Sequence, residues 1–168
     1  PLEGIIFKGR NEWKNTPTGS NGYALLTGIP NQTMQRISID ESSIDDPFMR
    51  VTTAQQYLYS HAGKQTELSF QLVPTLELEG KIFRQVEGKK YPSSNLPLFL
   101  YDKNEKLFAS TNSEYDGVYL FENIIPGKYR LEISQNYLQK HQYKPVDELI
   151  IEADGSEGVI YLPTITLE

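Results

Sequence analysis

The sequence predicts an all-β fold built from two small β-sandwich modules in tandem, of the Ig-like or transthyretin-like kind. Three observations support this prediction. Short stretches of alternating apolar and polar residues recur roughly every ten residues, turn-forming pairs separate them, and no long stretch keeps the spacing of an amphipathic helix. Because 38% of the residues are hydrophobic and 11% are aromatic, the chain carries enough apolar side chains to bury a core.

The alternating stretches define the expected strands. The predicted strands are 3–8, 22–26, 35–40, 67–73, 76–84, 98–102, 106–111, 118–122, 128–134, 148–152 and 158–162, with shorter ones at 50–53 and 57–59. Asn21-Gly22 and Asp116-Gly117 lie between strands, where they supply the positive φ angles that tight turns require.

Residues 114–134, EYDGVYLFENIIPGKYRLEIS, predict a strand, a turn and a second strand in the form of a hairpin. Alternation places one set of side chains on the same face of the first strand: Tyr119, Phe121 and Asn123. Pro126-Gly127 is expected to form the turn, with the glycine in the left-handed conformation. In the second strand the buried face is expected to hold Tyr129, Leu131 and Ile133.

A weaker copy of this pattern lies at residues 21–40, which suggests two related modules. The alternative is that any two β-hairpins resemble each other to this degree. The boundary is expected between Val73 and Pro74, where one strand ends and LELEGKIF begins another. The predicted domains are 1–73, with a polar, loop-rich excursion at 41–66, and 74–168.

Composition limits the classes of partner. Sixteen basic and 22 acidic residues give a formal charge of -6, which argues against binding to nucleic acid or anionic lipid. The chain has no cysteine, so it forms neither disulfides nor thiolate metal sites. No apolar run approaches the roughly 20 residues of a transmembrane helix. The chain opens at Pro1 with no signal peptide and no initiating Met, so it is expected to be a piece of a longer protein, and this piece is not expected to insert into the membrane.

The sequence shows no set of residues typical of catalysis, so we expect a protein that is not an enzyme and needs no cofactor or metal. His61 and His141 lack the spacing of metal ligands and are expected in solvent-facing loops. Asp102, Asn104 and Glu105 make up half of a calcium loop, but the same residues are ordinary in a polar hairpin turn, which is the preferred interpretation.

The 11 tyrosines are the unusual feature of the composition. Tyr57, Tyr59, Tyr137 and Tyr143 lie in or beside predicted loops, where an amphipathic ring can anchor a partner. Tyrosine is also common in strands for reasons of packing alone. The single tryptophan, Trp13, is expected to be partly buried.

Two stretches carry a resemblance to known families. Residues 78–134, with GKI, LFLYD and PGKYRL, resemble the prealbumin-like, carboxypeptidase-regulatory type of β-sandwich module. GSNGYALLTGIPNQTMQRISIDESSIDD, followed by HAGKQTELSFQLVPTLELEGKIF, is similar to the C-terminal region of bacterial outer-membrane fimbrial ushers. The matching positions are Asn21, Gly22, Ala24, Leu26, Ile37, Ile39, Asp40, Gly63, Leu68, Phe70 and Leu72.

The usher resemblance implies a function in pilus assembly through the chaperone-usher pathway. It implies a protein-binding and transport role on the periplasmic side of the outer membrane, as part of a larger barrel protein. The implied partners are chaperone-pilin subunit complexes, which this fragment would bind without making or breaking a bond. The four tyrosines named above and the module edges would then form the binding surface.

Two other interpretations stay open. One is a surface adhesin or carbohydrate-binding β-sandwich module of a secreted protein. LPTIT at 162–166 lacks the Thr-Gly pair of a sortase signal, and IYLPTITLE has no asparagine for an isopeptide bond. The other is an accessory domain beside an enzyme in the same parent chain.

Overall fold

The structure is a computed structural model that describes residues 1–9 and 14–168. Its contacts divide the chain into two compact units, unit 1 (Pro1–Val73) and unit 2 (Pro74–Glu168). The predicted all-β class is confirmed: strands dominate both units, and a single short α-helix is present among the described residues. Trp13, for which partial burial was expected, lies outside the described residues.

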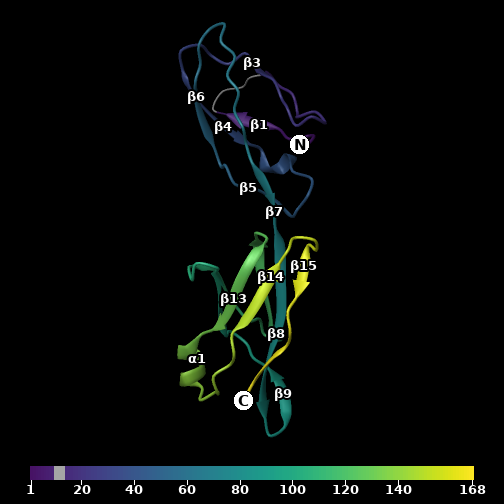
Figure 1. The fold of residues 1–168 in the computed structure, drawn as a ribbon, viewed down its shortest axis with the longest axis vertical. Coiled ribbons are helices and arrows are strands. Elements are labelled where there is room, and N and C mark those ends of the chain that lie inside the picture. Colours follow the sequence, from purple (N-terminus) through teal and green to yellow (C-terminus); the bar gives the residue numbers. More distant parts are fainter. Residues whose placement is uncertain (10–13) are drawn as a thin grey trace. The chain divides into compact units, whose positions relative to one another are not determined.

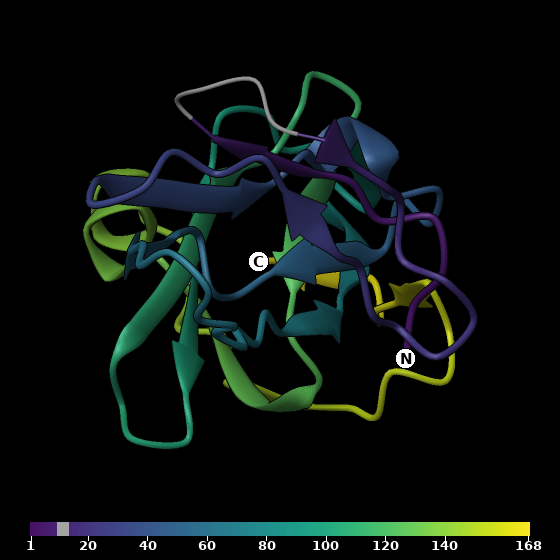
Figure 2. The ribbon, with the colours of Figure 1, turned by 90° about the horizontal axis from the view of Figure 1, so that it is seen from above.

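Unit 1 is organised around a three-stranded antiparallel sheet (Figures 1 and 2). Its strands, in spatial order, are β1 (Phe7–Gly9), β4 (Met34–Ile39) and β6 (Gln56–Tyr59). Burial alternates along β4, so one face of this sheet is covered and the other is open to solvent. The buried hydrophobic residues described in unit 1 are Ile5, Ile37 and Ile39, which make a small core.

Two short antiparallel ladders complete unit 1. β2 (Lys14–Asn15) pairs with β3 (Leu26–Thr27), and β5 (Met49–Val51) pairs with β7 (Leu72–Pro74). The expected excursion at 41–66 therefore contains regular structure: the 3-10 turn η1 (Glu41–Ser43) and the strands β5 and β6. The expected strand at 67–73 is reduced to its last two residues, which belong to β7.

Unit 2 is a β-sandwich of two sheets. One sheet is antiparallel, in the order β11 (Leu107–Asn112), β10 (Pro97–Asp102), β13 (Gly127–Ile133), β14 (Leu149–Ala153). The other sheet is centred on the longest strand, β8 (Leu76–Val86). The strands that pair with β8 are β9 (Lys89–Pro92), β12 (Val118–Ile124), β15 (Val159–Tyr161) and β16 (Ile165–Leu167).

The core of unit 2 fills the space between the two sheets with apolar side chains from alternate positions. On β8 these are Leu76, Leu78 and Ile82, each fully buried. On β13 they are Tyr129, Leu131 and Ile133, as the period of two predicts. The only α-helix among the described residues, α1 (Gln135–Lys140), begins at Ser134, whose hydroxyl accepts the amide hydrogen of Tyr137, and adds Leu138 to the core.

The segment 114–134 corrects the hairpin prediction. β12 pairs with β8, whereas β13 pairs with β10 and β14, so the connection crosses from one sheet to the other. The register of β12 shifts between Phe121 and Ile124, and Asn123 adopts a φ of 59° there. This bulge exposes Asn123 and buries Ile124, contrary to simple alternation. Gly127 lies within β13 without the left-handed φ expected of it.

Candidate functional site

The open face of the β4–β6 sheet brings four large side chains together. Met34 lies opposite Tyr59, and Arg36 lies opposite Tyr57, in the antiparallel register. All four are exposed; Met34, Tyr57 and Tyr59 are 61%, 60% and 48% accessible. Side chains directly opposite each other on one face lie about 5 Å apart at Cβ, so these four form a continuous surface. We call it the tyrosine face.

Two contacts orient the rings of the tyrosine face. The side-chain amide of Gln55 donates a hydrogen bond of 3.0 Å to the Tyr57 hydroxyl. The ring of His61 meets the ring of Tyr59 edge-on, with 5.2 Å between centroids. A tyrosine held in this way loses little further rotamer freedom when it binds a partner, which lowers the entropic cost of binding.

The covered side of the same strands anchors the face. Gln35 and Ile37, which alternate with the exposed residues of β4, are each 1% accessible. The side-chain amide of Gln35 donates to the Thr33 hydroxyl at 2.6 Å. Ser60, directly after β6, donates its backbone amide hydrogen to the Thr33 carbonyl and its hydroxyl hydrogen to the Pro30 carbonyl. The sheet edge that carries the two tyrosines is therefore held by partly buried polar contacts.

A small charged pair links β1 to the residue that follows β4. The Lys8 ammonium is 3.5 Å from Asp40, the residue that follows β4. Hydrogen bonds from the hydroxyl and the backbone amide of Ser42 to Asp40 lower the pKa of this carboxyl, with a further contribution from Lys8. Asp40 also caps η1 and so belongs to the local framework of the turn.

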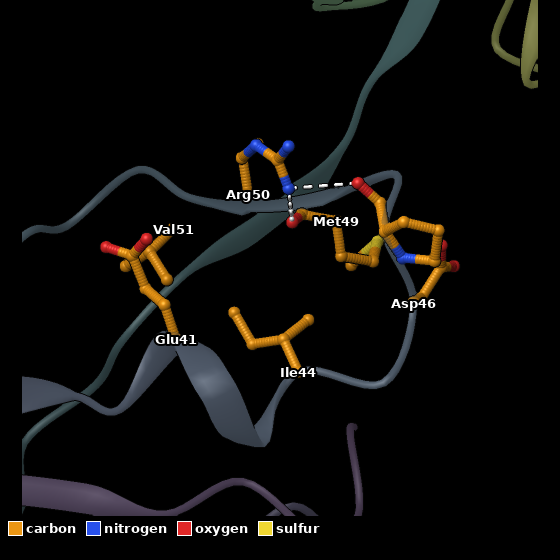
Figure 3. A pocket seen from close by; sticks show the side chains of 7 residues that line it. Glu41, Ile44, Asp46, Met49, Arg50 and Val51 are labelled. Carbon is orange, nitrogen blue, oxygen red and sulfur yellow. Dashed lines mark hydrogen bonds between the residues drawn. The ribbon is translucent and has the colours of Figure 1, made fainter.

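A pocket of about 290 Å³ lies elsewhere in unit 1 (Figure 3). Its lining residues are Glu41, Ile44, Asp46, Pro47, Met49, Arg50 and Val51. The Arg50 guanidinium donates to the carbonyl oxygens of Pro47 and Met49 at 2.9 and 3.1 Å, which holds the loop in shape. The volume is at the lower limit for small-molecule sites, and the lining contains no nucleophile paired with a base.

Unit 2 carries a charge cluster on the outer face of β13. Arg130 makes ion pairs with Glu105, Glu132 and Glu148, and its guanidinium lies 4.7 Å from the centroid of the Tyr101 ring. The hydrogen bonds that the Arg130 guanidinium donates to Glu105 and Glu132 are the main cause of its raised pKa. Because three carboxylates already surround the cation, this cluster joins strands and is not an open anion site.

The four predicted binding tyrosines fall into two groups. Tyr57 and Tyr59 lie together on the tyrosine face of unit 1, whereas Tyr137 and Tyr143 belong to unit 2. The unit 2 pair is partly buried and packs against the core. His141 lies with them; its ring centroid is 4.3 Å from that of Tyr137 and 6.2 Å from that of Tyr143. Both histidines of the chain are exposed and contact tyrosine rings.

The turn after β10 uses its carboxylate on its own backbone. Asp102 accepts hydrogen bonds from the amides of Lys106 and Asn104 at 3.0 and 2.8 Å, and these bonds lower its pKa. Across residues 1–9 and 14–168, no cluster of three or more His, Cys, Asp or Glu side chains is arranged to hold a metal ion. None of the helices formed by these residues has the length and hydrophobicity that a membrane crossing requires.

Sequence reasoning did not single out Met34 and Arg36 as members of the site. Their strand was expected, but the partner of that strand was not, and only the pairing of β4 with β6 places them beside the tyrosines. The available signal was the pair of alternating patterns around MQRISI and QYLY, in which large exposed residues occur at every second position.

Comparison with known proteins identifies two relatives of the sequence. The family described as BOS complex subunit NOMO1-like, second beta sandwich domain, matches residues 76–148, less than half of the chain. Colossin-A from Dictyostelium discoideum is 45% identical over 157 residues. That alignment covers 80% of this chain, and the chain spans about 1% of the length of Colossin-A.

Solved structures with a similar chain path include two bacterial pilins. The BcpA D312A major pilin subunit of Bacillus cereus has a TM-score of 0.47 and 14% identity, over 84% of this chain and 40% of that one. The minor pilin GBS52 of Streptococcus agalactiae has a TM-score of 0.43 and 11% identity, over 99% and 83%. With both scores below 0.5, these likenesses carry no conclusion about function.

These findings correct the usher interpretation, which is wrong. The sequence relatives are a NOMO1-like β-sandwich domain and a eukaryotic protein, so the fimbrial usher family, the chaperone-usher pathway and a site on the periplasmic side of a bacterial outer membrane are all overturned. The quoted motifs consist of turn glycines and alternating strands, which many β-sandwich modules share. Such motifs indicate the fold but not the parent protein. The coarser conclusion is that the chain contains a β-sandwich domain similar to those of NOMO1-like and Colossin-type proteins.

Proposed function

We propose that the chain is a non-catalytic binding segment of a longer secreted protein, and that its tyrosine face holds a carbohydrate. The observation that carries the proposal is the pair of tyrosines, Tyr57 and Tyr59, exposed at 60% and 48% on one face of an ordered strand. Large exposed apolar side chains gathered on one surface are typical of interaction sites.

The chemistry of the tyrosine face favours a sugar as the ligand. Rings two positions apart on a strand are separated by roughly 6.6 Å, so two tyrosines present neighbouring apolar platforms. The C–H face of a pyranose packs against such a ring, and sugar hydroxyls bond to nearby polar groups. Gln55, Arg36 and His61 supply those polar groups around the two rings.

Two further observations support a binding module over an enzyme. The pocket in Figure 3 lacks an activated nucleophile, and the Arg130 cluster is neutralised by its own carboxylates. The similarity to a very small part of Colossin-A is what a module within a long chain would show. The usher-derived partner, a chaperone-pilin complex, has no remaining support.

The proposal is tested by binding of the full chain to an array of neutral and acidic oligosaccharides. We expect selective binding that is lost in the Tyr57→Ala/Tyr59→Ala double variant. Arg36→Ala separates the two glycan classes, because loss of this cation weakens the binding of an acidic sugar more than the binding of a neutral one.

Tyr115→Ala is the matched control. Tyr115 is 85% exposed and lies in the turn before β12. It belongs to unit 2, whereas the tyrosine face belongs to unit 1. Its loss should leave glycan binding unchanged. Binding that persists in the double tyrosine variant, or the absence of binding to every glycan class, would overturn the proposal and leave a structural spacer.

A further inference from the structure

We infer that unit 2 is a mechanical clamp, which resists tension along the chain by shear between β8 and its two parallel neighbours, β15 and β16. The clamp is independent of the tyrosine face and uses only contacts within unit 2.

The path of the chain through unit 2 places entry and exit at opposite ends of one strand. The chain passes from Pro74 directly into β8 at Leu76. It returns to the same strand at the end of the unit, where Leu167 of β16 lies opposite Arg84. In Figure 1, β8 runs along unit 2 with β15 beside it, and the C-terminal residue lies near the end where β9 begins. From Leu76 to Arg84 the strand covers roughly 26 Å.

The last two strands both run parallel to β8. β15 aligns Val159, Ile160 and Tyr161 with Glu77, Leu78 and Glu79. β16 aligns Ile165, Thr166 and Leu167 with Ile82, Phe83 and Arg84. Two further bonds extend the first ladder, from the Glu77 amide to the Gly158 carbonyl at 2.8 Å and from the Leu162 amide to the Glu79 carbonyl at 2.7 Å.

Parallel pairing determines how the ladder between β8 and β16 is loaded. Tension between Pro74 and Glu168 pulls β8 toward its first residue and β16 toward its last. Because the two strands point in the same direction, these forces slide one strand along the other. All the ladder bonds then bear load together and must break together, unlike the bonds of an antiparallel hairpin pulled apart from one end, which break one after another.

Buried side chains hold the sliding surfaces in place. Leu76, Leu78 and Ile82 of β8 and Leu167 of β16 are all fully buried in the core. Slippage by one residue would turn each inward side chain to the outer face, since the side-chain period of a strand is two. The hydrophobic core therefore opposes the same displacement as the hydrogen bonds.

The test is single-molecule unfolding of the full chain in two pulling directions. The protein has no cysteine, so handles are introduced only where needed. Pro74→Cys/Glu168→Cys places tension along β8 and leaves unit 1 outside the loaded segment. Lys128→Cys/Glu152→Cys pulls on two exposed residues that lie opposite each other in the antiparallel β13–β14 pair, which opens as a zipper.

We expect a several-fold higher unfolding force for the 74/168 pair than for the 128/152 pair at the same loading rate. Thermal unfolding of both variants without load should match wild type, which separates a directional effect from a change in stability. Equal forces in the two directions, or a lower force along β8, would overturn the inference.

A pair of core truncations gives a second measure. Leu167→Ala weakens the anchor of β16, whereas Leu98→Ala removes an equally buried leucine from β10 in the opposite sheet. Both variants carry handles at 74 and 168. For the same loss of equilibrium stability, Leu167→Ala should lower the unfolding force more than Leu98→Ala does. An equal or greater effect of Leu98→Ala would contradict a clamp located between β8 and β16.

Discussion

The ring of Tyr119 occupies the space that a Cβ atom at Gly80 would need. The two residues are register partners on β12 and β8, and both are buried. A Cβ built on Gly80 would lie 2.8 Å from Cε1 of Tyr119 and closer still to Cζ and the hydroxyl oxygen. Gly80 has no left-handed φ, so packing alone requires the glycine. The buried tyrosine and the glycine form one structural unit at the centre of the sandwich.

Gly80→Ala should therefore destabilise unit 2. Overpacking of a buried site costs about 1–3 kcal/mol, which outweighs the entropic benefit of alanine over glycine in a strand. Gly127→Ala is the control, because a Cβ there would be 3.5 Å from the nearest atoms, which belong to the Tyr129 ring. Urea unfolding measures both, and similar stabilities of the two variants would refute the packing role.

Removal of the hydroxyl group should change the free energy of unfolding in opposite directions at two buried tyrosines. Within the described residues, the Tyr119 hydroxyl is the only buried side-chain N or O atom without a hydrogen-bond partner, whereas the Tyr129 hydroxyl donates to the Ile125 carbonyl at 2.6 Å. Tyr119→Phe removes an unsatisfied polar group and should raise the free energy of unfolding by about 1 kcal/mol. Tyr129→Phe should lower it by about 1 kcal/mol. Denaturant unfolding measures the stability of both variants. A loss of stability in Tyr119→Phe would contradict the conclusion that the Tyr119 hydroxyl is buried without a hydrogen-bond partner.

Alkaline pH should weaken unit 2 through Tyr119. Burial raises the pKa of this phenol from 10.0 to about 12. The unfolded chain loses the proton first, so the stabilising contribution is present below pH 10 and is lost as the pH rises toward 12. Wild type should lose more stability over this interval than Tyr119→Phe, as followed by thermal unfolding at each pH. Parallel curves for the two proteins would show that Tyr119 does not titrate in this way.

Unit 1 should open more readily than unit 2. Its described core holds three buried hydrophobic residues, whereas a cluster of sixteen fills unit 2. Local stability follows buried apolar contacts, so backbone amides of β4 and β6 should exchange with solvent faster than those of β8 and β13. Hydrogen exchange measured by NMR or mass spectrometry tests this expectation. Slower exchange in unit 1 would contradict this expectation and would show that the polar network around Ser60 and Gln35 stabilises unit 1 more than its small core does.

Much of the fold was predictable from the sequence because alternation is a local property. The buried series Tyr129, Leu131 and Ile133 follows directly from the period of two. Local patterns also located β8 and β10 to within two residues of their ends. The bulge at Asn123 and the crossing of the chain between sheets were not predictable in this way, since both depend on which strands pair. The helix α1 has six residues, too few to show a helical period.

Only half of the candidate site could be predicted from the sequence. Tyrosine content drew attention to Tyr57 and Tyr59, but Met34 and Arg36 join them through the pairing of strands some twenty residues apart in the chain. The exposure of Tyr57 and the partial burial of Tyr137 likewise result from tertiary packing. Turn glycines and alternating strands recur among unrelated β-sandwich proteins, which is why the motifs indicated the correct fold but the wrong parent.

The most direct test of the proposed binding function is NMR titration of the ¹⁵N-labelled full chain with an oligosaccharide selected from the glycan array. The account predicts shift changes at the amides of Met34, Arg36, Tyr57 and Tyr59 that saturate together, while amides of β8 and β13 stay unchanged. Changes confined to Tyr137 and Tyr143, or at the pocket around Arg50, would contradict the tyrosine face as the site of recognition.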